Sequence, residues 1–137
     1  MWKVAILSLV LLLEATTAFG QQAGCLLTSQ RPMIVAELFF GRAIRGRGQV
    51  SEAEWSGFVA SVVAKQLPDG FTVQDGAGHW LDPVTQKVVR ERTKILIVAG
   101  DPATNLGTRL RAVMAGYRRQ FRQQSVGIIT TSGCGAF

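Results

Sequence analysis

Four side chains of this 137-residue chain could transfer protons or bind a charged ligand: Glu37, His79, Arg92 and Lys94. Glu37 is the most unusual of them, because it interrupts an apolar segment that extends from residue 33 to residue 40. A carboxylate in apolar surroundings needs a partner or a shifted pKa. Glu37 is therefore a candidate general base or hydrogen-bond acceptor, or else one half of a structural ion pair.

The alternation of residues around Lys94 suggests the partner of Glu37. Thr93, Ile95 and Ile97 are the expected core positions of this segment, so Arg92 and Lys94 should point the other way. Glu37 is expected on that same open face of a sheet. We therefore predict an ion pair between Glu37 and Lys94 or Arg92, and a structural role is the commoner explanation of such a pair.

His79 is the only histidine and stands between Gly78 and Trp80. A lone histidine without a cluster of Cys, His or Asp is a poor metal site, and no Ser-His-Asp arrangement follows from the spacing. We expect no metal and no cofactor. The glycines at 76 and 78 do not form a phosphate-binding loop, because no Lys-Ser/Thr and no helix follow them.

Basic residues outnumber acidic ones, with 15 Lys and Arg against 9 Asp and Glu and a net charge of +6. Five arginines lie mostly off the apolar stripe of the second predicted helix, which favours either a solvated face or an anionic envelope component such as lipid or peptidoglycan. They are Arg109, Arg111, Arg118, Arg119 and Arg122. A nucleic-acid partner is not expected for an exported chain.

The N-terminus predicts export. Lys3 precedes an apolar run over residues 4–13, which is too short to span a bilayer and has the length of a signal-peptide core. The small residues of Ala18-Phe19-Gly20 predict cleavage after Gly20. We therefore expect a signal peptide at 1–20, an N-terminal segment at 21–32, a domain at 33–137, and a periplasmic or secreted location.

The segment Ala23-Gly24-Cys25 also resembles the end of a lipobox, although Gln22 stands where an aliphatic residue is usual. Lipid anchoring through Cys25 is the alternative to plain secretion, and it is the one route to a membrane that we expect.

The remaining chain predicts four strands and two helices. Strands are expected at 33–42, 71–81, 87–99 and 125–131, with a mobile basic loop at 42–49. One helix begins with a capping box of Ser51 and Glu54 and stops at Leu67-Pro68. The other begins near Asp101-Pro102, with the aspartate as its cap.

The order strand-helix-strand-strand-helix-strand predicts an α+β, ferredoxin-like split βαβ sandwich. Two helices cover one face of a four-stranded antiparallel sheet in this fold, and the first and last strands are neighbours. Cys25 precedes the first strand and Cys134 follows the last, so the fold brings them to one edge. We predict a Cys25–Cys134 disulfide; the competing interpretation is a lipidated Cys25 and a free Cys134.

Five ordered motifs resemble a family of secreted bacterial proteins known as domain of unknown function 3574. They are Glu37-Leu38-Phe39-Phe40-Gly41, Val50-Ser51-Glu52-Ala53-Glu54-Trp55, Pro68-Asp69-Gly70-Phe71-Thr72-Val73, Gly78-His79-Trp80 and Arg90-Glu91-Arg92-Thr93-Lys94. The likeness runs from about residue 33 to residue 137. It implies a small exported bacterial protein and carries no catalytic residues.

Two classes of function stay open. The first is a non-enzymatic binding or interaction domain, such as a homodimer that uses the open sheet face. The second is a small enzyme with a pocket on that face around Glu37, Lys94 and His79, which is an analogy of fold alone.

Overall fold

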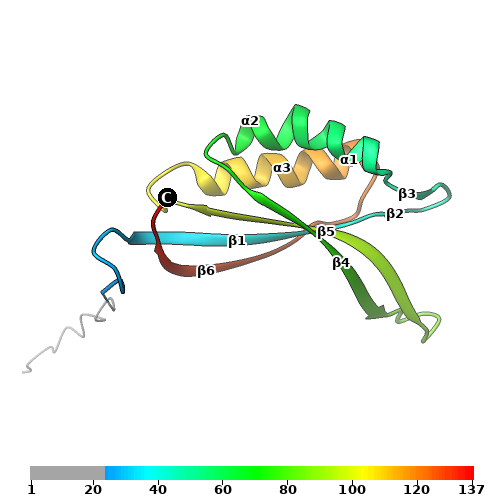
Figure 1. The fold of residues 1–137 in the computed structure, drawn as a ribbon. Coiled ribbons are helices and arrows are strands. Elements are labelled where there is room, and N and C mark those ends of the chain that lie inside the picture. Colours follow the sequence, from blue (N-terminus) through cyan, green and yellow to red (C-terminus); the bar gives the residue numbers. More distant parts are fainter. Residues whose placement is uncertain (1–23) are drawn as a thin grey trace, which may run out of the picture.

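The computed structural model describes residues 24–137, so the expected signal peptide and its cleavage after Gly20 lie outside the described residues. Within these residues the helices and strands follow one another in the order drawn in Figure 1. They are β1 (Arg31–Gly41), β2 (Ala43–Ile44), β3 (Gly48–Gln49), α1 (Glu52–Phe58), the π-helical turn η1 (Val59–Val63), α2 (Ala64–Gln66), β4 (Thr72–Leu81), β5 (Val88–Gly100), α3 (Leu106–Phe121) and β6 (Gly127–Gly135).

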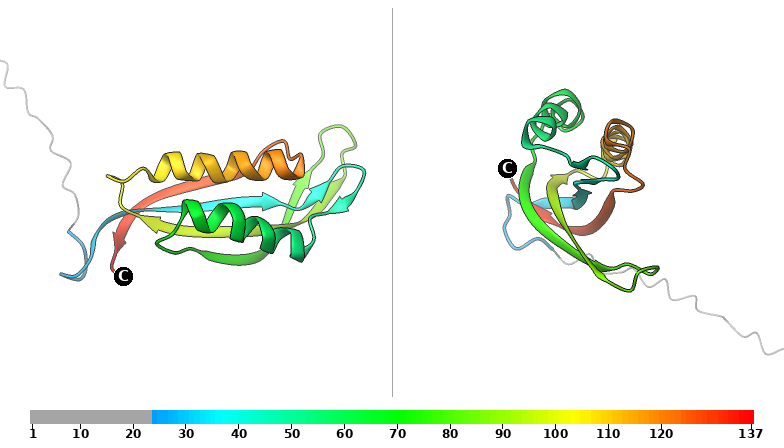
Figure 2. Two further views of the ribbon diagram at one scale, coloured as in Figure 1. Left: turned by 90° about the horizontal axis from the view of Figure 1, so that it is seen from above. Right: turned by 90° about the vertical axis from the view of Figure 1, so that its right-hand side faces the viewer.

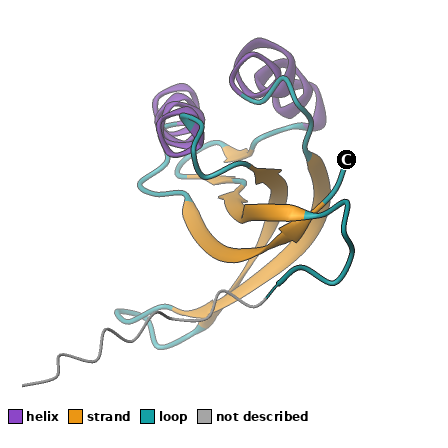
Figure 3. Cartoon of the chain, turned by 90° about the vertical axis from the view of Figure 1, so that its left-hand side faces the viewer, coloured by secondary structure: helices purple, strands orange, loops and turns teal. Residues whose placement is uncertain are grey.

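The four long strands form one antiparallel sheet in the order β4-β5-β1-β6. The segment α1-η1-α2 and helix α3 lie along the same face of this sheet, as Figures 2 and 3 show from three directions. The predicted ferredoxin-like α+β arrangement is therefore confirmed. The other face of the sheet is covered by no helix of the described chain, and we call it the open face.

The core lies between the sheet and the helices. Phe40 of β1 packs edge-on against Tyr117 of α3, with ring centroids 4.8 Å apart, and against Trp55 of α1 at 5.3 Å. Burial raises the pKa of the Tyr117 hydroxyl, which therefore stays protonated and donates a hydrogen bond to the carbonyl of Gly41 at 2.9 Å. These contacts hold both helices over the end of β1.

The start of the first helix follows the sequence prediction closely. The Ser51 hydroxyl accepts from the Glu54 amide, and the Glu54 carboxylate accepts from the Ser51 amide at 2.8 Å. These two reciprocal bonds satisfy amides that a helix terminus leaves without a partner.

Helix α3 begins four residues later than expected, at Leu106 after Asn105 rather than at Pro102 after Asp101. The carboxylate of Asp101 does accept a backbone hydrogen bond, from Ala103 at 2.7 Å, but the carbonyl of Asp101 accepts from Thr104 and closes a separate turn. The cap therefore belongs to this turn, and Asn105 precedes the helix without a side-chain cap.

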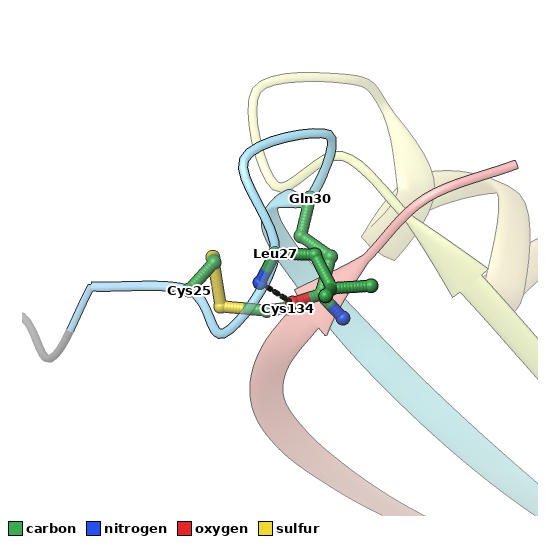
Figure 4. The surroundings of a disulfide bond; sticks show 4 residues. All are labelled: Cys25, Leu27, Gln30 and Cys134. Atoms are coloured by element: carbon green, nitrogen blue, oxygen red, sulfur yellow. Dashed lines mark hydrogen bonds between the residues drawn. A yellow bond between two sulfur atoms is a disulfide. The ribbon is translucent and has the colours of Figure 1, made fainter.

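Cys25 and Cys134 form the predicted disulfide, with Cα atoms 5.6 Å apart across 109 positions of sequence (Figure 4). Strand β6 extends to Gly135, four residues beyond the expected end, and this brings Cys134 opposite Pro32 on β1. A Cys25 sulfur in this bond has no valence left for a lipid, so the interpretation with a free Cys134 is wrong. No helix within residues 24–137 is long and apolar enough to cross a membrane.

Candidate functional site on the open sheet face

The pairing of β1 with β5 decides which residues share a face. Phe40 lies opposite Lys94, and Glu37 lies opposite Ile97. Because side chains alternate along a strand, Lys94 points to the helix-covered face and Glu37 to the open face. Arg92 has the parity of Lys94. The predicted ion pair between Glu37 and Lys94 or Arg92 is therefore wrong.

Lys94 instead joins two carboxylates from other elements. Its ammonium group lies 2.6 Å from a carboxylate oxygen of Asp75 on β4 and 2.9 Å from one of Glu52 in the first turn of α1. Desolvation of the nearly buried side chain opposes its charge, but the hydrogen bonds with Asp75 and Glu52 outweigh this effect and raise the pKa of Lys94. The lysine is thus held as a cation in a structural role.

Arg42 completes this charged cluster. It is 2% exposed, donates to the carbonyl of Val50 at 2.8 Å, and lies 2.5 Å from the second carboxylate oxygen of Glu52. Hydrogen bonds from Lys94 and then from Arg42 lower the pKa of the Glu52 carboxyl. The arginine that the sequence placed in a mobile loop therefore anchors the start of α1 to the end of β1.

The open face is apolar around Glu37. Its cross-strand neighbours are Ile97 on β5 and Ile129 on β6. Three further apolar side chains point to the open face and are partly exposed: Val35 and Phe39 on β1, and Ile95 on β5. No ion pair to Glu37 forms within residues 24–137. A single carboxylate thus stands in the middle of an uncovered apolar surface.

His79 does not join this site. It lies opposite Arg90 on β5, whereas its neighbour Trp80 lies opposite Val89. The parity of β5 therefore places Trp80 on the open face and His79 on the reverse side, where it is exposed. The predicted trio of Glu37, Lys94 and His79 is split between the two faces. The described residues hold no group of three His, Cys, Asp or Glu side chains suited to a metal ion.

A broad groove borders one end of the open face, between the β2–β3 hairpin and the connection from α3 to β6. It is lined by eighteen residues, among them Phe39 and Trp80 from the open face and the cations Arg45 and Arg122. Glu91 in the groove accepts a hydrogen bond from the Ala43 amide at 2.9 Å. Sequence analysis missed this groove, because the hairpin that forms its wall was expected to be a mobile loop.

Of the five arginines of the second helix, Arg109 contacts other parts of the fold. The guanidinium group of Arg109 donates to the carbonyl of Gln66 at 2.5 Å and to Asp69 at 3.1 Å, so Arg109 ties α3 to the end of α2. The other four are exposed: Arg111, Arg118, Arg119 and Arg122. Arg122 caps α3 with a φ of 53°, a left-handed conformation that is uncommon for a residue with a side chain.

Comparison with known proteins gives a family and a fold. A family model described as "Protein of unknown function (DUF3574)" matches residues 35–137. No curated protein matches this chain. A phage SAM lyase in complex with S-methyl-5'-thioadenosine is similar in structure, with a TM-score of 0.56 and 13% identity over 77% of this chain and 90% of that chain. A phage SAM lyase in its apo state gives a TM-score of 0.54 and 13% identity over 76% of this chain and 89% of that chain.

Proposed function

This chain belongs to the DUF3574 family of proteins of unknown function, and we propose that it is an exported interaction domain whose open sheet face binds a second copy of the same chain. The observation that carries this proposal is the uncovered apolar surface on which Glu37 lies between Ile97 and Ile129. The side chain of Ile129 on this surface is 56% exposed. Contiguous exposed apolar surface of this kind marks interaction sites in soluble proteins.

A second copy is the partner that best fits this face. Closed homo-oligomers are the commonest soluble assemblies, and a two-fold contact needs only one self-complementary patch. An apolar face bordered by few charges is self-complementary. The carboxylate of Glu37 would be buried in such a contact, where it would need a hydrogen-bond donor or a cation from the facing copy.

Two features support export. The segment with Lys3 and the apolar run at 4–13 has the composition of a signal peptide. The disulfide between Cys25 and Cys134 would persist in an oxidising compartment and is rare in a reducing cytosol.

Sedimentation velocity over a range of protein concentrations tests the association. The wild-type chain is expected above the monomer mass, and Ile97→Asp is expected to lower the mass of the assembly because it places a second carboxylate beside Glu37 on the face. Leu81→Asp is the matched control, since Leu81 is 57% exposed but has the parity of the reverse side. A monomeric wild-type protein, or equal effects of the two substitutions, would contradict the proposal.

Export is tested by producing the full chain in a bacterial host and measuring the intact mass of the periplasmic fraction. The expected product begins at Gln21 and is about two mass units lighter than its reduced form. Protein that stays in the cytoplasm with Met1 retained, or that carries lipid on Cys25, would contradict this part of the proposal.

One observation favours a second candidate, a small-molecule site. The groove beside the open face combines the aromatic rings of Phe39 and Trp80 with the polar groups of Glu91 and Thr93. S-methyl-5'-thioadenosine, the compound in the phage structure, is a suitable probe because it joins an aromatic base to polar sugar hydroxyls. Titration calorimetry with this compound should show binding that Trp80→Ala weakens; absence of heat at millimolar concentration would remove the candidate.

A further inference from the structure

Strand β6 is an unprotected edge of the sheet. It extends over Gly127–Gly135, pairs with β1 on one side, and is exposed at every residue but the last. Its sequence, GIITTSGCG, contains no charged residue and no proline. Within residues 24–137 no strand pairs with its other side, so backbone amides and carbonyls there form a template for a further strand.

The opposite edge of the same sheet is different. Strand β4 carries Asp75 and His79, and two glycines at positions 76 and 78 interrupt its apolar surface. Natural sheets protect their edges with charges and irregularities of this kind, and edges that lack them pair with other chains. The contrast between the two edges indicates that β6 is the one that acquires a partner.

The apolar side chains of β6 also remain uncovered. Ile128 is 41% exposed on the helix side of the sheet, and Ile129 is 56% exposed on the open face. A strand added beside β6 would bury part of both residues at once. Burial on both sides of the strand favours an extended partner over a helix or a loop.

We propose that β6 pairs antiparallel with β6 of a second copy, through a two-fold axis near Thr131, the midpoint of the strand. A contact between the same strand of two copies closes on itself, whereas pairing of β6 with the protected edge β4 would propagate into a filament. The axis is perpendicular to the sheet, so the two open faces lie side by side as one larger face.

This inference rests on the proposed function and extends it to a second, separate interface. Two edge-paired dimers then pack their joined open faces together, which gives a tetramer with one edge contact and one face contact for each chain. Such dimers of dimers are common among soluble homo-oligomers. Ile129 contributes to both contacts, but Thr130 and Ser132 lie only at the edge and Ile97 only on the open face, so each contact can be disrupted by itself.

The test uses charges on the edge. Thr130 and Ser132 have the parity of the helix side, so substitutions there leave the open face unchanged. In Thr130→Lys/Ser132→Lys, each new lysine faces a lysine of the other copy across an axis at Thr131, and like charges directly opposite weaken strand pairing. The matched control is Thr130→Glu/Ser132→Lys, which places opposite charges across the same axis. Far-ultraviolet circular dichroism and thermal unfolding verify that both variants fold.

Sedimentation velocity of the exported, processed chain gives a distinct result for each interface. The wild type is expected as a tetramer, the Lys/Lys variant as a dimer with edge association weakened about tenfold or more, and the Glu/Lys control as a tetramer. Ile97→Asp is expected as an edge-paired dimer, and Ile97→Asp combined with Lys/Lys as a monomer.

Other outcomes separate the two proposals. A wild-type dimer that Ile97→Asp dissociates and that Lys/Lys leaves intact would overturn the edge pairing while the face contact stands. A monomeric wild type would overturn both. Equal masses of the assemblies formed by Thr130→Lys/Ser132→Lys and by Thr130→Glu/Ser132→Lys would contradict a two-fold axis at Thr131.

Discussion

The ammonium group of Lys94 lies 2.6 Å from the carboxylate of Asp75, its cross-strand partner on the helix-covered face of the sheet. Glu52 accepts from the same ammonium group and from Arg42, so a single carboxylate bridges two buried cations. This cluster joins β4, β5, the end of β1 and the start of α1. Glu52 and Lys94 belong to two of the ordered motifs, at 50–55 and 90–94, and the cluster gives these two motifs a structural explanation.

The cluster predicts an asymmetry between removing its cation and removing its anions. Lys94→Met keeps the apolar stem and leaves Asp75 and Glu52 free to contact water, so we expect the free energy of unfolding to fall by about 1 kcal/mol. Asp75→Asn combined with Glu52→Gln leaves two buried cations, Lys94 and Arg42, without a carboxylate, and we expect a larger loss. Urea unfolding at neutral pH measures both. A smaller loss in the double variant would show that the two cations reach water when their carboxylates are removed.

The sequence was sufficient to predict the fold because each element carries its own signal. The Ser51–Glu54 capping box, the apolar stripe that ends at Phe121 and the glycine-bounded strands specify the order of elements. The order of elements then predicts the order of strands in the sheet, and this order brings Cys25 and Cys134 close together. Each of these steps needs only local periodicity and known connection rules.

The site could be predicted only in part, because faces cannot be assigned where both sides of a strand are apolar. In β5 the run Ile95-Leu96-Ile97-Val98 is apolar at every position, so the alternation of side chains does not show which face of the strand is buried. The sequence therefore assigned Lys94 to the wrong face of the sheet. Its true partners, Glu52 and Asp75, come from α1 and β4 and depend on tertiary packing. The position of Arg42 could have been predicted, because it continues the alternation of Leu38 and Phe40 and so points to the helix-covered face.

The capping box predicts how stability depends on pH. Hydrogen bonds from the Ser51 backbone and then from Arg47 lower the pKa of Glu54 from its ordinary 4.5 to about 2. A carboxyl with a lowered pKa in the folded state stabilises the protein above pH 4.5, and this contribution is lost as the pH falls toward 2. Glu54→Gln keeps a capping acceptor but cannot titrate.

We therefore expect the difference in unfolding free energy between wild type and Glu54→Gln to be largest above pH 4.5 and to shrink as the pH approaches 2. Urea titrations at a series of pH values between 2 and 7 measure this difference. A difference that stays constant over the whole series would show that the Glu54 charge contributes nothing to the folded state.

The disulfide predicts a large response to reductant. Cys25 and Cys134 close a loop that spans 109 positions, and the chain-entropy model gives a stabilisation of roughly 3–5 kcal/mol for a loop of that length. Guanidinium unfolding with and without reductant should therefore give midpoints that differ clearly. Cys25→Ser/Cys134→Ser is the control: its unfolding should match that of the reduced wild type and should not respond to reductant.

Gly41 and Glu91 predict a coupling between neighbouring strands. A Cβ atom at Gly41 would lie 2.6 Å from a carboxylate oxygen of Glu91, and that oxygen holds the Ala43 amide at 2.9 Å. Gly41→Ala must therefore displace Glu91 and break its bond to the start of the β2–β3 hairpin. We expect a loss of about 1–2 kcal/mol from this substitution in the wild-type background.

The same substitution should cost much less in a Glu91→Ala background, where the carboxylate that the new Cβ would meet is gone. A double-mutant cycle of Gly41→Ala and Glu91→Ala should then show a coupling energy of about 1 kcal/mol, as expected for residues in direct contact. Additive effects would mean that Glu91 swings aside without cost. The hairpin wall of the groove would in that case be held by Gln123, whose amide donates to the Ala43 carbonyl at 2.7 Å, and not by the carboxylate.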